Sequence, residues 1–263
     1  MNKISIPKTF DNVALFFDVD GTLLNIASKP DAITVPSELP VLLQDLGSKT
    51  KGAVALVTGR EIAFIDRIFP AVKLVVSGLH GAELRTLDGV IDSTKPSDEF
   101  LNAKEYLQQK AAYYPGVIFE DKCASVALHY RNASNYEAHV KASLAQAAII
   151  AGSKWQIQYG KMVAELRPAD CDKGNAIVQL MQSEPFKGRI PYAFGDDLTD
   201  EDMFLACTRF GGAGIRIAQN NHNSIATHSI SSPEKLHLFL KHILEQPEGT
   251  DIVSSLNGYL RKD

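Results

Sequence analysis

Cysteine is scarce in this chain. Three occur among 263 residues, at Cys123, Cys171 and Cys207, and they are odd in number and far apart. No Cys-x-x-Cys pair or Cys/His spacing suggests a zinc site, and no even set suggests a disulfide framework. The cysteine pattern therefore indicates a reducing compartment.

Long apolar runs are missing as well. Runs such as Val13–Phe17 and Ala53–Val57 are far shorter than the roughly 20 residues needed to span a bilayer. Residues 1–11 are largely polar and lack an apolar stretch long enough for a signal peptide. We therefore expect a cytoplasmic protein without a membrane-embedded segment.

An excess of basic residues is also absent. Lys and Arg total 27 against 31 Asp and Glu, which gives a net charge of −4. Without a basic excess a chain does not neutralise a phosphate backbone, so nucleic-acid binding is disfavoured. A small anionic substrate is still compatible, because a few local cations suffice to bind it. Nothing in the composition indicates an obligate protein partner.

The order of apolar runs predicts an α/β core. Three short runs typical of buried strands, at Val13–Phe17, Ala53–Val57 and Leu74–Val76, alternate with amphipathic helical segments. This alternation implies right-handed crossovers and a parallel sheet. The same pattern resumes after Pro168, with Tyr192–Phe194 as a further buried strand.

Between these two parts the pattern is different. A hairpin turn signal at 87–90 is followed by two helix candidates and by strands that adjoin strands through short connections. Such strands favour an antiparallel sheet with two helices. We therefore expect a Rossmann-like parallel-sheet core, residues 1–83 and 169–263, with an inserted α+β cap domain, residues 84–168.

Paired carboxylates follow the first predicted strand. Asp18 and Asp20 stand in the segment Asp18-Val19-Asp20-Gly21-Thr22-Leu23, directly after Phe17. In open α/β sheets ligands bind at the carboxyl ends of the strands, so both carboxylates are expected at the binding edge. Gly21 permits a tight turn there.

A second acidic cluster follows the strand Tyr192–Phe194. It reads Gly195-Asp196-Asp197-Leu198-Thr199-Asp200. Either acidic cluster alone is equally compatible with an ordinary turn or helix cap. Two such clusters at one sheet edge repel each other unless a cation lies between them, and oxygen-only ligands suit a hard ion. The pair therefore predicts a Mg²⁺ site.

A hydroxyl and a lysine complete the pattern. Thr58 ends the second strand, and Lys173 opens a helix after the inserted segment. At the same sheet edge they supply groups that bind phosphate beside the metal.

Four motifs of this chain resemble those of the haloacid-dehalogenase-like phosphohydrolases: Asp-x-Asp-Gly-Thr-Leu, Thr58-Gly59-Arg60, Lys173 and Gly-Asp-Asp-x-Thr-Asp. The position of the insertion resembles the subclass with a large α/β cap. Further segments look like signatures of the trehalose-6-phosphate phosphatase family: Val57–Arg60, Gly78–Glu83, Ala127–Arg131, Ala164–Pro168 and Phe194–Asp202.

The resemblance implies a Mg²⁺-dependent phosphatase of trehalose biosynthesis that acts on trehalose 6-phosphate through an aspartyl-phosphate. Asp18 is then the nucleophile, and Asp20 is the general acid and base. Thr58 and Lys173 hold the phosphoryl oxygens.

The resemblance also implies the ligands of the metal. They are Asp18, the backbone carbonyl of Asp20 and Asp196. Asp197 and Asp200 are expected to support the metal site and Lys173 without contacting phosphorus.

Substrate choice is expected to rest with the cap, because the core groups contact only phosphate. The resemblance points to Glu120, Lys122 and Glu165 as substrate-binding residues. His129 and Arg131 are further candidates, since alternate positions of one strand face the same side. For each of them the plain alternative is an exposed strand position.

Four further residues near the core motifs are candidates for the binding cleft. Gly59 and Arg60 are expected to contact the substrate. His80 and Glu83, where the third strand leads into the cap, either line the cleft or pack at the hinge.

Three other functions stay open. A phosphatase of another sugar phosphate, such as sucrose 6-phosphate, differs only in its cap contacts. A sugar-phosphate mutase would pass the phosphoryl group to a second hydroxyl, and a non-catalytic sugar-phosphate sensor would bind without turnover. The intact Asp18 and Asp20 argue against the sensor.

Spaced apolar residues in 248–263 are compatible with a packing helix.

Overall fold

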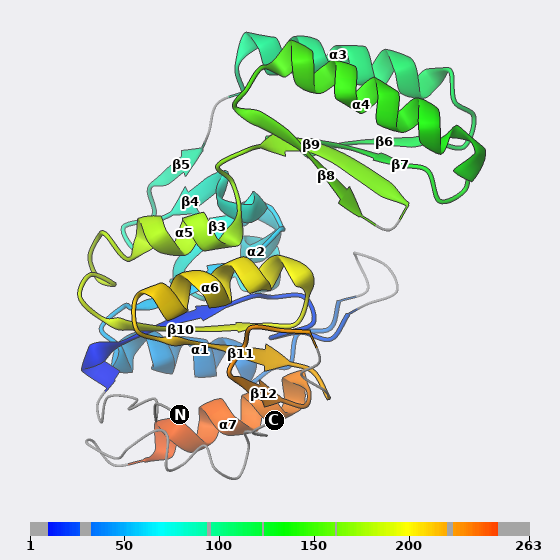
Figure 1. Ribbon diagram of the computed structural model, residues 1–263. Helices are drawn as coiled ribbons and strands as arrows, with labels where there is room; N and C mark the ends of the chain where they lie inside the picture. The colour runs from blue at the N-terminus through cyan, green and yellow to red at the C-terminus, as the bar shows by residue number, and fades with distance from the viewer. Residues whose placement is uncertain are drawn as a thin grey trace. The chain divides into compact units, whose positions relative to one another are not determined.

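The computed structural model describes six stretches of the chain: residues 10–26, 33–93, 96–122, 124–160, 162–219 and 223–246. The predicted helix in 248–263 and the residue Cys123 lie outside them. The chain divides into two compact units (Figure 1). The core unit comprises residues 1–92 and 172–263, and the cap unit comprises residues 93–171.

Among the described residues, the sheet of the core unit has eight strands. Their order across the sheet is β12 (His228–Ile230), β11 (Ala213–Ile217), β10 (Ile190–Gly195), β1 (Val13–Phe17), β2 (Val54–Val57), β3 (Val75–Gly78), β4 (Glu83–Arg85) and β5 (Ile91–Ser93). The pairs from β12 to β3 are parallel, and β4 is antiparallel to β3. The predicted α/β core with a mostly parallel sheet is confirmed.

Helices cover both faces of this sheet (Figure 1). They are α1 (Leu39–Lys49), α2 (Ile62–Ile68) and α7 (Pro233–Glu245) on one face, and α5 (Lys173–Leu180) and α6 (Glu201–Arg209) on the other. Side chains of a strand point alternately to the two faces, so Phe17 packs with α1 and α7 while Phe16 packs with α5 and α6. This two-sided burial explains why β1 is a continuous apolar run.

The register of the parallel strands brings the motifs to one edge. Phe17 pairs with Phe194 of β10 and with Leu56 of β2. The residues that follow these three strands therefore meet at their carboxyl ends. Asp18, Thr58 and Asp196 are in those positions, as the sequence predicted.

The predicted hairpin at 87–90 forms between β4 and β5, but it belongs to the core unit. Thr86 N donates to the carbonyl of Val90 at 3.0 Å, and β4 extends the core sheet by pairing with β3. The cap unit accordingly spans 93–171 instead of the expected 84–168. The change of pattern after Glu83 marks the change from parallel to antiparallel pairing, not a domain boundary.

The cap unit has its own antiparallel sheet. The order of its strands is β6 (Ile118–Asp121), β7 (Val126–His129), β9 (Val163–Pro168) and β8 (Trp155–Gly160). Helices α3 (Asp98–Ala112) and α4 (Glu137–Ala151) cover one face (Figure 1). Buried Phe100, Leu128 and Leu144 belong to one cluster between the helices and the sheet. This unit confirms the predicted α+β cap.

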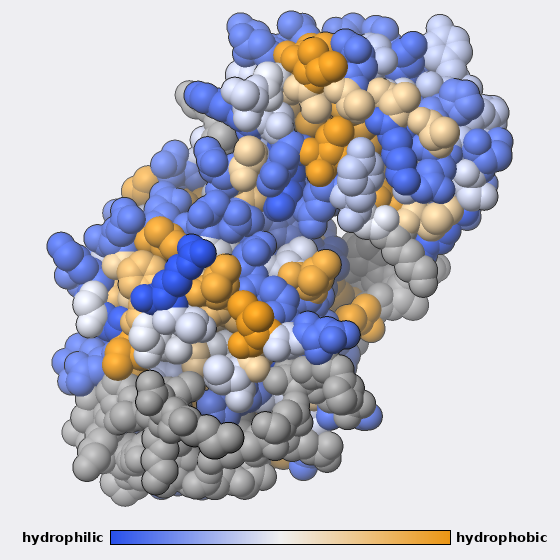
Figure 2. Space-filling view, in the orientation of Figure 1, coloured by the Kyte–Doolittle hydropathy of each residue, from blue (hydrophilic) through white to orange (hydrophobic). Residues whose placement is uncertain are grey.

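In the described parts of the chain, short 3-10 helices occur at four places: η1 (Phe10–Asn12), η3 (Leu79–Gly81), η4 (Ser134–Tyr136) and η5 (Leu198–Asp200). Within the described ranges, no helix is long and apolar enough to cross a membrane. Polar side chains cover much of the visible surface of both units, with hydrophobic side chains in smaller groups between them (Figure 2).

Candidate active site

A buried ion-pair network lies at the carboxyl edge of the core sheet. Lys173, the first residue of α5, donates from Nζ to Oδ1 of Asp18 and to Oδ1 of Asp200, each at 2.7 Å. All three side chains are almost fully buried. A buried lysine stays charged only when it is paired, and here two carboxylates pair with it. The network therefore holds the predicted nucleophile against a fixed cation.

The charges in this network are not balanced. Burial raises the pKa of Asp18, Lys173 opposes this effect, and the charge of Asp200 adds to it. Burial acts to lower the pKa of Lys173, but the carboxylates of Asp18 and Asp200 outweigh it and raise that pKa. Burial and the neighbouring carboxylates of Asp200 and Asp197 raise the pKa of Asp196 to about 7. The raised pKa values show that full ionisation of these carboxylates beside a single lysine is unfavourable, so a further cation would stabilise their ionised forms.

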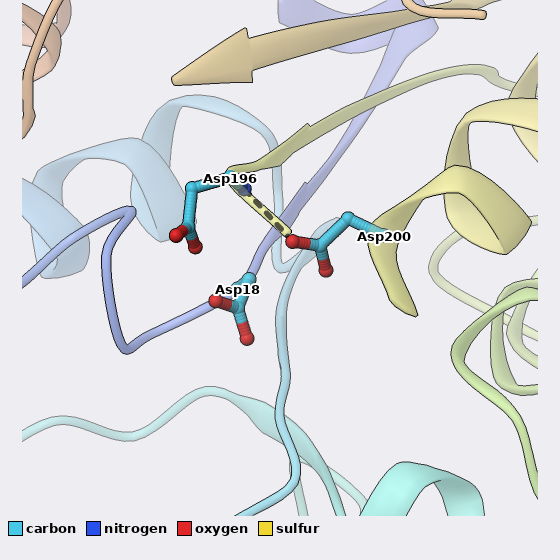
Figure 3. Close-up of side chains that lie close together, drawn as sticks. All are labelled: Asp18, Asp196 and Asp200. Carbon is cyan, nitrogen blue, oxygen red and sulfur yellow. Dashed lines mark hydrogen bonds between the residues drawn. The ribbon is translucent and has the colours of Figure 1, made fainter. Parts of the chain in front are cut away.

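Three carboxylates are close enough to share such a cation. Oxygens of Asp18, Asp196 and Asp200 lie within 4.8 Å of one another (Figure 3). Asp200 is already engaged, because its Oδ2 accepts from the backbone N–H groups of Asp196 and Asp197 at 2.8 and 3.0 Å. Asp196 accepts a longer hydrogen bond, 3.4 Å, from the hydroxyl of Thr22. Asp18 and Asp196 therefore fit a hard cation best, and Asp200 fits an orienting role.

Two glycines let these carboxylates approach the backbone. Gly21 has φ +85°, and a Cβ there would lie 2.2 Å from Oδ2 of Asp196. A Cβ on Gly195 would lie 2.3 Å from Cγ of Asp200. Neither contact is possible for a larger residue without displacing a carboxylate. The glycines of both acidic motifs are therefore steric requirements of the site.

The hydroxyl of Thr58 lies at the end of β2 and is buried. Its Oγ1 accepts from the backbone N–H of Arg60 at 3.1 Å, which leaves its proton to donate elsewhere. The side chain of Arg60 forms two hydrogen bonds with Asp20. Sequence reasoning placed Arg60 on the substrate and missed this pair, because 40 residues separate its members.

The two residues left open between cleft and hinge have different surroundings. Glu83 accepts from the backbone N–H of Ile62 at 2.9 Å and so caps the start of α2. His80 has a left-handed backbone (φ 55°) and its ring lies against Gly59, where a Cβ would approach Nε2 to 2.6 Å. Glu83 thus has a structural role, and Gly59 makes room for His80.

Within the cap unit, four of the predicted residues lie together. His129 Nε2 is 2.6 Å from Oε2 of Glu120, and Lys122 Nζ is 3.1 Å from Oε2 of Glu165. Lys122 also lies 4.0 Å from Glu120. Ser125 donates to Oε1 of Glu165 at 2.5 Å. We name Glu120, Lys122, Ser125, His129 and Glu165 the polar cap cluster.

Strand alternation places this cluster on the open face of the cap sheet. Leu128 and Leu166 point into the hydrophobic cluster under the helices, so their neighbours His129 and Glu165 face the other way. Ser125 was missed at the sequence level, although its spacing from His129 puts it on the same face. The two Glu residues stand in one row, each paired with Ala127 between them.

The expectation that Arg131 lies on the same strand as His129 and faces the same side was wrong. Strand β7 ends at His129, and Arg131 lies exposed in the turn that follows. Alternation along a strand therefore does not align it with His129.

Comparison with known proteins assigns the family. The model of the Trehalose-phosphatase family matches residues 16–237. A probable trehalose-phosphate phosphatase of Sinorhizobium fredii is 44% identical over 226 residues, covering 86% of this chain and 85% of that protein.

Solved structures agree on the fold. A trehalose-6-phosphate phosphatase related protein superposes with a TM-score of 0.69 at 26% identity, covering 88% of this chain and 97% of that one. A haloacid dehalogenase-like hydrolase from B. subtilis has a TM-score of 0.63 at 17% identity, covering 88% and 99%. Its likeness shows the haloacid-dehalogenase-like fold alone. By its sequence match over most of its length, the chain belongs to the trehalose-phosphatase family.

Proposed function

We propose that this protein hydrolyses trehalose 6-phosphate to trehalose and inorganic phosphate, as a step of trehalose biosynthesis. The observation that carries the proposal is Asp18, held by Lys173 at the carboxyl edge of the sheet in a chain of the trehalose-phosphatase family. A carboxylate fixed beside a buried cation is suited to attack phosphorus.

In the first step, an oxygen of Asp18 forms a bond to phosphorus while the bond from phosphorus to the sugar oxygen breaks. Asp20 gives its proton to that oxygen, so the sugar leaves as a neutral alcohol. In the second step, water attacks the phosphorus of the aspartyl-phosphate, Asp20 takes a proton from that water, and the bond between phosphorus and the Asp18 oxygen breaks. Inorganic phosphate leaves, and both side chains return to their starting state.

Two residues bind the phosphoryl oxygens in this proposal. Lys173 has three N–H donors, and the bonds to Asp18 and Asp200 use two of them, so a third can reach a phosphoryl oxygen. Thr58 donates from its hydroxyl. Fixed donors of this kind stabilise the charge that spreads over the phosphoryl oxygens in the transition state.

The donor set fits Mg²⁺, because it consists of carboxylate oxygens that lie close together and that a cation would hold in their ionised forms. Asp18, Asp196 and the backbone carbonyl of Asp20 would hold the ion. When bound, Mg²⁺ offsets the repulsion between the Asp18 carboxylate and the phosphate dianion. Asp200 orients Lys173, and its hydrogen bonds to the backbone hold the segment that carries Asp196 and Asp197.

We propose that the polar cap cluster selects the sugar. Its carboxylates and ammonium pair with one another and offer several acceptors and donors to hydroxyl groups. A site built from paired polar groups rejects a substrate that leaves them unpaired.

We also propose that the protein works in the cytoplasm. Cys207 is a buried free thiol, which agrees with a reducing compartment.

The first test measures phosphate release from trehalose 6-phosphate, sucrose 6-phosphate, glucose 6-phosphate and p-nitrophenyl phosphate, with Mg²⁺ and with EDTA. We expect release that needs Mg²⁺ and prefers trehalose 6-phosphate. Asp18→Asn should fold and lose turnover, while Asp45→Asn on the exposed face of α1 should keep it.

Other outcomes would select among the remaining functions. Preference for sucrose 6-phosphate would support the proposed core chemistry and indicate sucrose 6-phosphate as the substrate. Isomerised sugar phosphate without free phosphate would indicate a mutase. Binding of the sugar phosphate without turnover at any Mg²⁺ concentration would indicate a sensor.

A further inference from the structure

The proposed acid and base, Asp20, is held by two hydrogen bonds from one arginine. Arg60 donates from Nε to Oδ2 of Asp20 at 2.7 Å and from Nη2 to Oδ1 at 2.9 Å. Both side chains are about 30% exposed, at 30% and 29%. A two-point contact between a guanidinium and a carboxylate fixes the plane of the carboxylate as well as its position.

Arg60 is itself fixed from several sides. Its guanidinium carbon lies 4.7 Å from the ring centre of Phe64, in the first turn of α2. Its backbone N–H donates to Thr58 Oγ1, and its carbonyl accepts from the N–H of Leu79 at 3.0 Å. The arginine therefore has little freedom, which is what a group that orients another side chain requires.

We propose that Arg60 is a positioning residue that aims the carboxyl of Asp20 at the leaving oxygen. Asp20 lies in the loop after β1, where its backbone forms an isolated β-bridge with Leu24, and no strand or helix restricts its side chain. The contact with Arg60 supplies that restriction, and Phe64 supports the guanidinium. The inference rests on the proposed function in one respect, namely that Asp20 transfers the proton.

This role differs from the substrate contact that the sequence suggested for Arg60. Two of its five N–H donors are directed at Asp20, the residue that transfers the proton in this proposal. The arginine acts on the reaction through Asp20 in this proposal.

The test compares two leaving groups. The sugar oxygen needs a proton to leave, whereas p-nitrophenolate leaves without one. Arg60→Ala should therefore lower kcat/KM for trehalose 6-phosphate by about 10²-fold, and for p-nitrophenyl phosphate by no more than about threefold. Arg67→Ala is the matched control, because Arg67 stacks on the same Phe64 ring at 5.0 Å. It should change neither value.

A conservative variant and chemical rescue separate positioning from a general loss of structure. Arg60→Lys keeps the charge but cannot reproduce the two-point contact, so it should restore less than about a tenth of the lost kcat/KM. Added guanidinium ion should restore part of the activity of Arg60→Ala towards trehalose 6-phosphate. A merely structural arginine would show no such rescue.

A double-variant cycle tests the link to Asp20 directly. Asp20→Asn should show the same leaving-group pattern. Adding Arg60→Ala to it should cost no more than about threefold, because the group to be positioned is no longer functional. Equal losses on both substrates, or losses that multiply in the double variant, would overturn the proposal. If the wild type acts on another alkyl phosphate instead, the proposed substrate fails, and the same comparison with that phosphate still tests Arg60.

Discussion

Nζ of Lys173 lies 2.7 Å from Oδ1 of Asp18, and their side chains are only 3% and 6% exposed. The two residues are 155 positions apart in the chain. The contact joins the first strand of the core unit to the helix that follows the cap unit. It is a buried ion pair between the proposed nucleophile and a proposed phosphate-binding lysine.

Replacing Lys173 should therefore affect stability as well as turnover. In Lys173→Met, Asp18 and Asp200 lose their shared cation, and leaving buried charges unpaired typically costs about 3–5 kcal/mol. Urea unfolding would measure the loss. Lys51→Ala removes an exposed pair with Asp11 and should cost less than about 1 kcal/mol. Similar losses for both variants would contradict the buried-pair argument.

Gly21→Ala should weaken metal binding. Its Cβ would overlap the carboxylate of Asp196, so that side chain must move. Gly89 is a matched control, because its φ of +84° is nearly the same and no atom lies within 4 Å of its Cβ position. Both variants should lose about 1–2 kcal/mol of stability from backbone strain.

Activity measured against Mg²⁺ concentration distinguishes the two glycine variants. Gly21→Ala should need about tenfold more Mg²⁺ for half-maximal activity, equivalent to about 1.4 kcal/mol of binding. Gly89→Ala should need the wild-type amount. An unchanged Mg²⁺ requirement in Gly21→Ala would argue against Asp196 as a ligand.

Mg²⁺ should also stabilise the folded protein. A ligand at a hundred times its Kd adds about 2.7 kcal/mol, because it binds the folded state alone. Thermal unfolding with and without Mg²⁺ would show this as a rise in Tm of about 5–10 °C. The rise should disappear in Asp196→Asn and persist in Asp45→Asn. A persistent rise in Asp196→Asn would place the ion elsewhere.

Glu165→Gln should change substrate choice without harming the core chemistry. Glu165 is the partner of both Lys122 and Ser125 in the polar cap cluster. Losing one charged hydrogen bond should raise KM for trehalose 6-phosphate by about tenfold to a hundredfold. KM for p-nitrophenyl phosphate should stay near the wild-type value.

The matched control for this prediction is Glu137→Gln. Glu137 also pairs with a lysine, Lys141, but on the surface of α4 away from the cluster. This variant should leave KM for both substrates near the wild-type values. Equal losses on both substrates in Glu165→Gln would instead assign Glu165 to the folding of the cap unit.

Local chemistry made much of the fold predictable. The predicted strand Val13–Phe17 begins and ends where β1 does, and the predicted strand Tyr192–Phe194 lies within β10. Two-sided burial produces a continuous apolar run, which is recognisable in the sequence. Strand β12 (His228–Ile230) was not predicted, because only one of its three residues, Ile230, is apolar.

Side-chain partners were less predictable than elements. The domain boundary was placed at residue 84, where the hydrophobic pattern changes, although β4 continues the core sheet. Arg131 was aligned with His129 on the assumption that the strand continues, and the strand ends first. Both errors arise because pairing and strand ends depend on distant neighbours.

The sequence by itself determined which residues are candidates for the chemistry and which strand ends they follow, since apolar runs, glycines and acidic motifs are local features of the chain. Only the tertiary structure decided the contacts among them. Lys173 reaches Asp18, and Arg60 reaches Asp20, across long stretches of intervening chain. Such contacts depend on the register of parallel strands and on helix placement, which are set by packing of the whole core and not by any one segment.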